Sequence, residues 1–254
     1  MGRMFKALII VPILAIRVPA YADQPDVKPL PEHQRFAYEQ TQPHQALAKL
    51  LAIPSFRASH VAQPFSDLDA LYQAAPDAQQ ELETLAAKIA QSVNGNVLSA
   101  GLKGKARAVE KVTKELGGDA SLLTDIVRIT VETDSIGSLN KAYEHLAANT
   151  QTVEVINRFH FPQPSGYRDL KVLVTLPESK LIAEVQFHLR AISEIKNGPE
   201  HYIYEQIQGI ERHAASEGRA LNDIEVVKIE KLRAESRKMY QLAWAQYQPL
   251  GMVV

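Results

Sequence analysis

Three polar side chains, Glu184, Gln186 and His188, alternate along one predicted β-strand. Residues 166–176 and 180–189 are rich in Val, Leu and Phe with near period-2 alternation, and turn residues at 177–179 join them, so a β-hairpin is expected. A buried carboxylate, amide and imidazole cost free energy unless they are paired, which favours a chemical site on this face. The alternative is an edge strand whose polar face meets water. The opposite face would be apolar and carry Leu181, Ala183, Val185 and Phe187.

Three cations, Lys103, Arg107 and Lys111, are spaced four residues apart where a loop enters a predicted helix that ends at Gly117 and Gly118. This spacing places them along one helical face. Such a ridge at a helix start is suited to a polyphosphate, because side-chain charges and free backbone N–H groups would meet the same ligand. An ordinary solvated face is the alternative. The segment is not a Walker loop, because the Gly-Lys-Ser/Thr of that motif is missing.

A carboxylate, Asp125, lies near the start of a β-branched segment at 122–131 that is expected to form a central strand. A carboxylate at the mouth of a strand is a usual ligand for Mg²⁺, and a turn cap is the alternative. A further strand over 152–160 would bring Arg158 near the hairpin.

The elements that must position these residues are strands enclosed by helices. Leu82, Leu85, Ile89 and Val93 recur at helical spacing. Further helices are expected over 136–148, over 189–214 with a break at 198–199, and over 221–247.

Composition bounds the class of protein. The chain has 254 residues, 46% of them hydrophobic, which is enough for one substantial core. A net charge of −1 gives no general case for DNA or RNA binding, so any nucleotide site must be local. The absence of cysteine excludes disulfides, thiolate nucleophiles and Cys-ligated zinc.

The N-terminus has the pattern of a secretory signal peptide. Arg3 and Lys6 precede an apolar run at 7–16, and Ala20-Tyr-Ala22 before Asp23 has the small residues of a cleavage site. We therefore expect a signal peptide at 1–22, a proline-containing, extended N-terminal arm at 23–64 with a short helix near 45–53, and a catalytic domain at 65–254. An uncleaved anchor and a buried strand are the alternatives for the first segment.

Taken in order, the motifs resemble the synthetase domain of the RelA/SpoT family over about residues 65–246. The resemblance rests on Lys-Gly-x-x-Arg-Ala-x-x-Lys at 103–111, Asp-Ile-x-Arg-x-Thr at 125–130, Gly-Tyr-Arg-Asp at 166–169, Ala-Glu-Val-Gln-x-His at 183–188, His-x-x-Tyr-Glu at 201–205 and Tyr-x-x-Ala-Trp at 240–244. The chain departs from the family where it has Val127-Arg128 in place of a usual Gly and His188 in place of a usual Arg. The fold implied is α+β, a mixed sheet of about five strands surrounded by helices.

The activity implied is transfer of the β,γ-diphosphate of ATP to a ribose hydroxyl of a nucleotide, either GDP or GTP or an adenine nucleotide. Asp125 and Glu184 would be the catalytic carboxylates and would hold Mg²⁺, and Glu184 would accept the proton of the attacking hydroxyl. The donor phosphates would contact Lys103, Arg107, Lys111 and Arg128. Tyr167 would stack on the acceptor base. The rest of the acceptor side would be lined by Arg158, Arg168, Gln186, His188, His201 and Tyr204.

The signal peptide and the nucleotide chemistry together favour an exported, periplasmic or secreted effector or toxin that acts on nucleotides of a target cell, with a target-cell or immunity protein as partner. DNA is not an expected partner. A membrane is not an expected partner either, once the signal peptide has been cleaved. Pyrophosphorylation of RNA 3′ ends, with tRNA as substrate, is an alternative that the single short basic cluster favours less. A non-catalytic nucleotide- or partner-binding module on the same fold is the alternative from another class.

Overall fold

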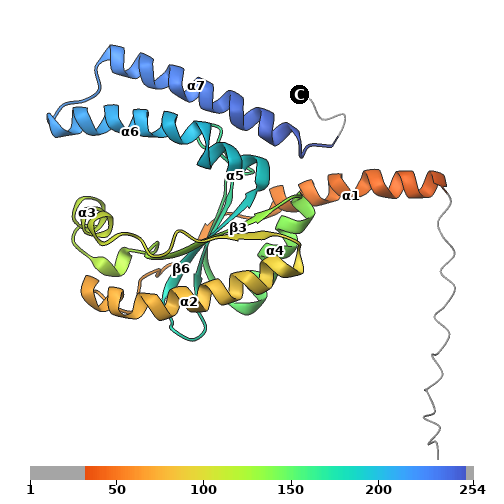
Figure 1. The fold of residues 1–254 in the computed structure, drawn as a ribbon, viewed down its shortest axis with the longest axis horizontal. Helices are drawn as coiled ribbons and strands as arrows, with labels where there is room; N and C mark the ends of the chain where they lie inside the picture. The colour runs from red at the N-terminus through yellow and green to blue at the C-terminus, as the bar shows by residue number, and fades with distance from the viewer. Residues whose placement is uncertain (1–31, 250–254) are drawn as a thin grey trace, which may run out of the picture.

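A six-stranded mixed sheet is the centre of the protein, for which a computed structural model describes residues 32–249, with side chains from residue 42 onward (Figure 1). The strands run in the order β1-β4-β5-β6-β3-β2. Only β3 and β6 pair in parallel. Their bounds are β1 Phe56–Arg57, β2 Asn96–Leu98, β3 Val127–Thr133, β4 Gln151–Asn157, β5 Leu170–Thr175 and β6 Ile182–Leu189. The α+β class with a mixed sheet is confirmed, with one strand more than the five expected.

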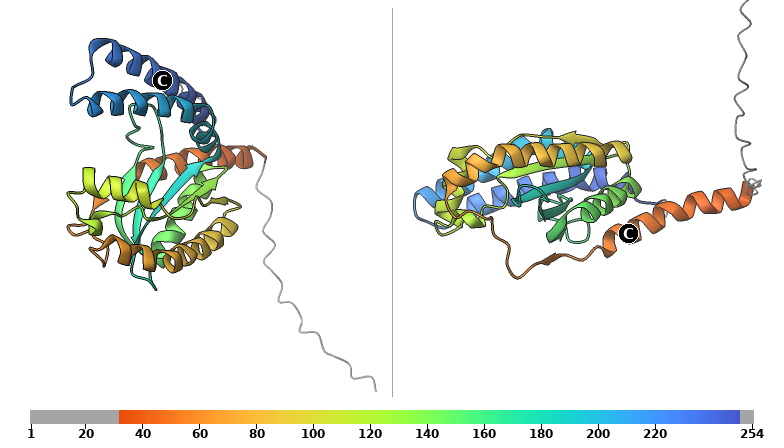
Figure 2. Two further views of the ribbon diagram at one scale, coloured as in Figure 1. Left: turned by 60° about the vertical axis from the view of Figure 1, so that its left-hand side comes forward. Right: turned by 90° about the horizontal axis from the view of Figure 1, so that it is seen from below.

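Helices cover both faces of this sheet. Their bounds are α1 Glu32–Ala52, α2 Leu68–Ser92, α3 Lys105–Glu115, α4 Ile136–Asn149, α5 Arg190–Asn197, α6 Pro199–Ser216 and α7 Asp223–Ala245. Helices α2 and α4 pack on one face, and α5 leads from the end of β6 to an α6–α7 hairpin on the other side (Figures 1 and 2). None of the helices within residues 32–249 has a stretch long and apolar enough to cross a membrane.

The period-2 pattern of the central hairpin divides the sheet as the sequence predicts. Ala183, Val185 and Phe187 are buried in the main core, on the side that α4 covers. Glu184 and Gln186 point to the opposite face, where in register they lie beside Arg128 and Thr130 of β3. The polar face therefore lies between the sheet and the α5–α7 segment.

The bounds of three predicted strands are wrong. Strand β5 begins at Leu170 and not at residue 166, since residues 166–169 form a loop. The segment 122–131 is a strand only from Val127, because Asp119 caps a short 3₁₀ turn through the backbone N–H of Ser121. Strand β4 ends at Asn157, whose side-chain oxygen accepts from the backbone N–H groups of Phe159 and His160 and so starts a turn.

The predicted arm also differs from expectation, because α1 is a long helix that contains Pro43. Leu47 and Leu50 are buried where α1 meets α4, and Asn140 of α4 donates to the carbonyl of Ala46. The chain then pairs through β1 with β4 and crosses to the start of the central strand β6, where Gln63 bonds both the N–H and the carbonyl of Ile182. This second part lies over the main domain, with Val61 packed against Val153, Leu173 and Ile182. The expected signal peptide lies outside the described residues.

Candidate active site

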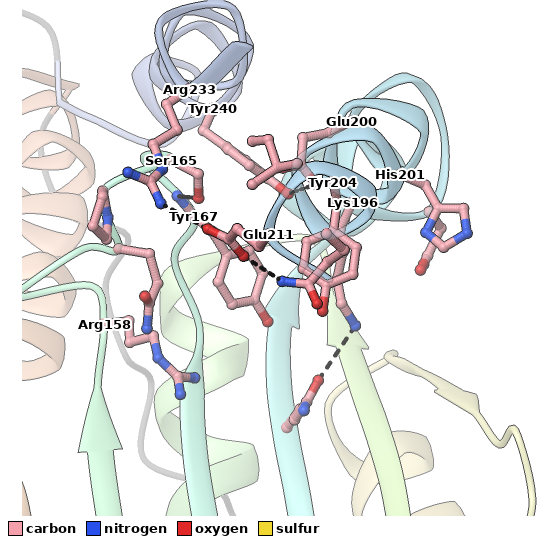
Figure 3. A pocket seen from close by; sticks show the side chains of 16 residues that line it. Arg158, Ser165, Tyr167, Lys196, Glu200, His201, Tyr204, Glu211, Arg233 and Tyr240 are labelled. Atoms are coloured by element: carbon pink, nitrogen blue, oxygen red, sulfur yellow. Dashed lines mark hydrogen bonds and ion pairs between the residues drawn. The ribbon is translucent and has the colours of Figure 1, made fainter. Parts of the chain in front are cut away.

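Two cavities lie next to each other on the polar face of the sheet. The larger, of about 760 Å³, lies between the strands and the α6–α7 hairpin (Figure 3). It is lined by sixteen residues, among them five of the predicted acceptor-side residues: Arg158, Tyr167, Gln186, His201 and Tyr204. The smaller, of about 220 Å³, lies over β2, β3 and β6 and is lined in part by Arg128, Thr130 and Glu184.

The loop before β5 positions Tyr167 at the wall of the larger cavity. Gly166 has a φ of +84°, and a Cβ there would lie 3.1 Å from the Cα of Arg237 on α7. Only glycine combines this backbone conformation with such a close approach. The side chain of Arg237 in turn donates to the carbonyl of Pro164. Tyr167 is thereby held between the sheet and α7, with its ring edge-on to that of Tyr240 at 5.7 Å.

A buried network lies beneath Tyr167. The hydroxyl of Tyr167 donates to Asp169 Oδ2 at 2.8 Å and lies 2.7 Å from His188 Nε2. Arg158 donates to Asp169 Oδ1 at 2.7 Å. The side chains of Asp169 and His188 are both 0% exposed. Because the single hydroxyl proton points to Asp169, we assign the neutral tautomer of His188 that donates from Nε2.

The charges of this network follow from its burial. Burial lowers the pKa of His188 to about 3, with nearby Lys196 and Arg158 acting in the same direction. Burial also raises the pKa of Asp169, although Arg158 and the hydroxyl of Tyr167 favour its charged form. His188 is therefore neutral at physiological pH and supports Tyr167 from below.

Two residues expected on the acceptor side are elsewhere. His188 lies on the predicted face of β6, but Tyr167 covers it, so it does not line the cavity. Arg168 donates to the carbonyl of Phe159 at 2.7 Å, and its guanidinium carbon lies 5.0 Å from the ring centre of Trp244. Arg168 thus joins the loop to α7 and points away from the cavity lining.

The predicted cationic ridge is arranged differently from a single helical face. Helix α3 begins at Lys105, so Lys103 lies in the preceding loop, which its backbone N–H ties to the carbonyl of Ile126 at 3.0 Å. Lys103 and Lys111 both donate to Asp125 Oδ2, at 2.9 and 3.0 Å. Arg107 is exposed to solvent. Two of the three cations therefore converge on the predicted metal-binding carboxylate.

This convergence sets the charge state of Asp125. Burial alone would raise its pKa, but the ammonium groups of Lys103 and Lys111 outweigh burial and hold the pKa below the ordinary value. Asp125 Oδ1 is buried without a hydrogen-bond partner among the described residues. The side chain is therefore an anion with one oxygen paired and one oxygen unused.

Glu184 lies in the smaller cavity within a row of charged groups. It accepts from Gln186 Nε2 at 2.7 Å, and its other oxygen is 4.0 Å from the ammonium of Lys171, which also pairs with the buried Glu154 at 2.8 Å. In the β3–β6 pair Glu184 is the register partner of Arg128. Glu184 and the predicted donor cation Arg128 are thus neighbours.

The residues fit a Mg²⁺ ion only as a pair of carboxylates. The described residues hold no cluster of three or more His, Cys, Asp or Glu side chains that could bind a metal. Asp125 precedes the register partner of Glu184 by three residues, which is roughly 10 Å along a strand. Mg²⁺ is usually held by one or two carboxylates together with substrate phosphates, so the unused oxygen of Asp125 would suit it, and Glu184 would ligate the same ion only with its side chain extended toward Asp125.

Sequence reasoning missed Lys171, Lys196 and Tyr240. Tyr240 lines the larger cavity and donates to the buried Glu200 at 3.0 Å, which joins α6 to α7. Lys196 of α5 lines both cavities. The position of Lys196 shortly before Gly198 carries no periodic signal in the sequence. Lys171, in contrast, follows the Gly-Tyr-Arg-Asp motif closely, and this proximity is a signal by which it could have been predicted as a site residue.

No protein-family model matches the sequence, and no curated protein is significantly similar to it. Solved structures do match. The type VI effector Tas1, in complex with its immunity protein, is 19% identical with a TM-score of 0.52 over 70% of this chain and 96% of that one. Small alarmone synthetase 2 from Bacillus subtilis is 18% identical with a TM-score of 0.53 over 70% of this chain and 92% of that one. The protein therefore has the RelA/SpoT-like synthetase fold, as the sequence motifs predict.

Proposed function

We propose that this protein is an ATP-dependent pyrophosphokinase that transfers diphosphate to a ribose hydroxyl of an acceptor nucleotide. One observation carries the proposal: a nucleotide-sized cavity beside Tyr167 adjoins a small charged cavity that contains Glu184 and Arg128. Ligand cavities of about 300–1,000 Å³ hold molecules of nucleotide size, so the larger fits an acceptor nucleotide and the smaller fits only a phosphate chain. The shared fold with the small alarmone synthetase supports the same activity.

In the proposed reaction the acceptor hydroxyl oxygen attacks the β-phosphorus of ATP. The bond from that phosphorus to the α,β-bridging oxygen breaks, AMP leaves with the electron pair, and Glu184 accepts the hydroxyl proton. Lys103, Lys111 and Arg128 would offset the phosphate charge, while Arg107 is exposed to solvent. Asp125 and Glu184 would hold Mg²⁺, which supplies further positive charge to the phosphates when bound.

Product identity tests the activity. The protein is incubated with labelled ATP and Mg²⁺ and with GDP, GTP, ADP, AMP or tRNA in turn, and the products are separated and identified by mass spectrometry. We expect release of AMP together with an acceptor that has gained two phosphates, and no product from the Glu184→Gln variant. Nucleotide binding without any AMP release would instead identify a non-catalytic binding module, and labelled tRNA would identify the RNA alternative.

Export is a second part of the proposal and is supported by the pattern of residues 1–22. An exported enzyme of this kind would act in a target cell, with an immunity protein in the producer. The name of the matched effector complex, an effector with its immunity protein, is consistent with this role. N-terminal sequencing of protein recovered outside the cytoplasm should begin at Asp23, and recovery of Met1 there would contradict cleavage.

A further inference from the structure

Lys196 occupies the boundary between the two cavities. Among the described residues, only Lys196 and Gln186 line both. The ammonium of Lys196 lies 3.4 Å from Gln186 Oε1, and Figure 3 shows the side chain pointing from α5 toward β6. Any group that passes from a donor in the smaller cavity to an acceptor in the larger one must pass these two side chains.

The backbone around Lys196 is fixed. Ile192 and Ser193 bury α5 against the sheet, with 0% and 1% of their surfaces exposed. Helix α5 ends at Asn197, and at the following Gly198 a Cβ would lie 2.7 Å from the carbonyl oxygen of Glu194, so only glycine fits. A side chain on such a support has a defined reach, as a group that contacts a reacting centre requires.

The charge of Lys196 is also less compensated than that of three neighbouring cations. Lys103 and Lys111 are paired with Asp125, and Arg158 is paired with Asp169. No carboxylate of the described residues lies within ion-pair distance of Lys196 or of Arg128, but Arg128 lines only the smaller cavity. Burial and Arg128 lower its pKa, while the nearby Asp169, Glu184 and Glu200 act in the opposite direction.

We propose that Lys196 is a catalytic residue whose ammonium contacts the diphosphoryl group while it moves from the donor cavity to the acceptor hydroxyl. This role rests on the proposed function. The ammonium donates hydrogen bonds to non-bridging oxygens of the phosphoryl group under attack, as the bond to the acceptor oxygen forms and the bond to AMP breaks. It keeps its own protons throughout, since the hydroxyl proton goes to Glu184. Its charge matters most in the transition state, because among the described residues it is the only cation that lines both cavities.

Kinetics of matched lysine variants test the proposal. Lys196→Met keeps the apolar stem and should lower kcat by about 100-fold or more, with KM for each substrate changed by less than about threefold, because a contact made in the transition state is lost. Lys196→Arg should recover part of kcat. Lys141→Met, an exposed lysine on α4 away from both cavities, should behave as wild type.

Three outcomes would overturn the role. A Lys196→Met enzyme with nearly normal kcat, or with only a raised KM for one substrate, would reject it while leaving the proposed function intact. A wild-type protein that transfers no diphosphate to any acceptor would instead reject the proposed function, and this role with it. The two failures are therefore distinguishable.

A footprinting experiment on the wild-type protein avoids dependence on the folding of variants. Lysines are acylated with acetic anhydride and quantified by mass spectrometry, with inorganic triphosphate alone, with GDP alone, and with neither. Since Lys196 lines both cavities, each ligand should slow its acylation, while Lys141 reacts at the same rate throughout. Protection by neither ligand would overturn the proposed position of Lys196.

Discussion

Replacement of Tyr167 by phenylalanine should destabilise the protein while leaving its ring in place. The hydroxyl is the common partner of Asp169 and His188, which are both fully buried. Each buried polar group left without a partner costs about 1–3 kcal/mol. In the variant, Arg158 still bonds the other oxygen of Asp169. We therefore expect the free energy of unfolding to fall by about 3 kcal/mol, which is near the low end of the range for two unpaired groups.

The free energy of unfolding in urea measures this loss. The single tryptophan, Trp244, is buried against Phe159 and reports unfolding by its fluorescence. Tyr204→Phe is the matched control, because Tyr204 lines the same cavity but is 52% exposed, and its loss should be within about 0.5 kcal/mol of zero. The urea dependence of the free energy should be unchanged, since the same surface is exposed on unfolding.

Kinetics then separate the ring from the hydroxyl. If the ring face stacks on the acceptor base, Tyr167→Phe should keep a nearly normal KM for the acceptor, whereas Tyr167→Ala should lose roughly 1–3 kcal/mol of binding. The reasoning about the buried network is refuted if Tyr167→Phe is as stable as wild type, or if Tyr204→Phe loses as much. A Phe variant that binds the acceptor as poorly as Ala would move recognition to the hydroxyl.

Two further predictions concern charge. The pKa of His188 is about 3 in the folded protein and about 6.5 in the unfolded chain, so between pH 7 and pH 5 only the unfolded chain gains this proton. The free energy of unfolding should therefore fall by about 2 kcal/mol from pH 7 to pH 5. His188→Gln, whose amide can still donate to Tyr167, should lack this part of the urea-measured pH dependence, and an equal dependence in both proteins would contradict the assignment. Asp125→Asn removes the carboxylate that pairs with the ammonium groups of Lys103 and Lys111. Calorimetry without Mg²⁺ should therefore show that the variant binds inorganic triphosphate more tightly than the wild type does. Unchanged or weaker binding would mean that these lysines do not receive the phosphates.

Hydrophobic periodicity predicts whether an element is a helix or a strand, and which face of a strand is buried. Strand β6 and helices α4 to α7 follow from their alternation and helical spacing because these elements bury a whole face. Strands β1 and β2 have two and three residues, which is too short for any period. Helix α1 is obscured in the sequence by Pro43 and by its polar residues, and its stability comes from packing of Leu47 and Leu50 with α4.

The sequence predicts which residues belong to the site better than it predicts how these residues are arranged. Alternation places His188 on the same face as Glu184, but it carries no information on what covers that face. The covering ring comes from a loop whose path depends on the contact of Gly166 with α7, some seventy residues later in the chain. Spacing likewise brought Lys103 and Lys111 together, although the contact is made through Asp125 and not along one helix.

The pairing of cations near the candidate site bears on which ligands the protein can bind. Lys103 and Lys111 share Asp125, and Lys171 is held by Glu154, so three cations of the ligand-free protein are already paired, while Lys196 and Arg128 are not. A phosphate that binds these lysines must compete with a carboxylate already 2.9 Å away. A ligand with one or two charges gains little from that exchange, whereas a polyphosphate with several charges can engage both ammonium groups and leave Asp125 free for a metal ion. The arrangement of Lys103, Lys111 and Asp125 therefore favours a polyphosphate ligand over a monophosphate or a neutral sugar.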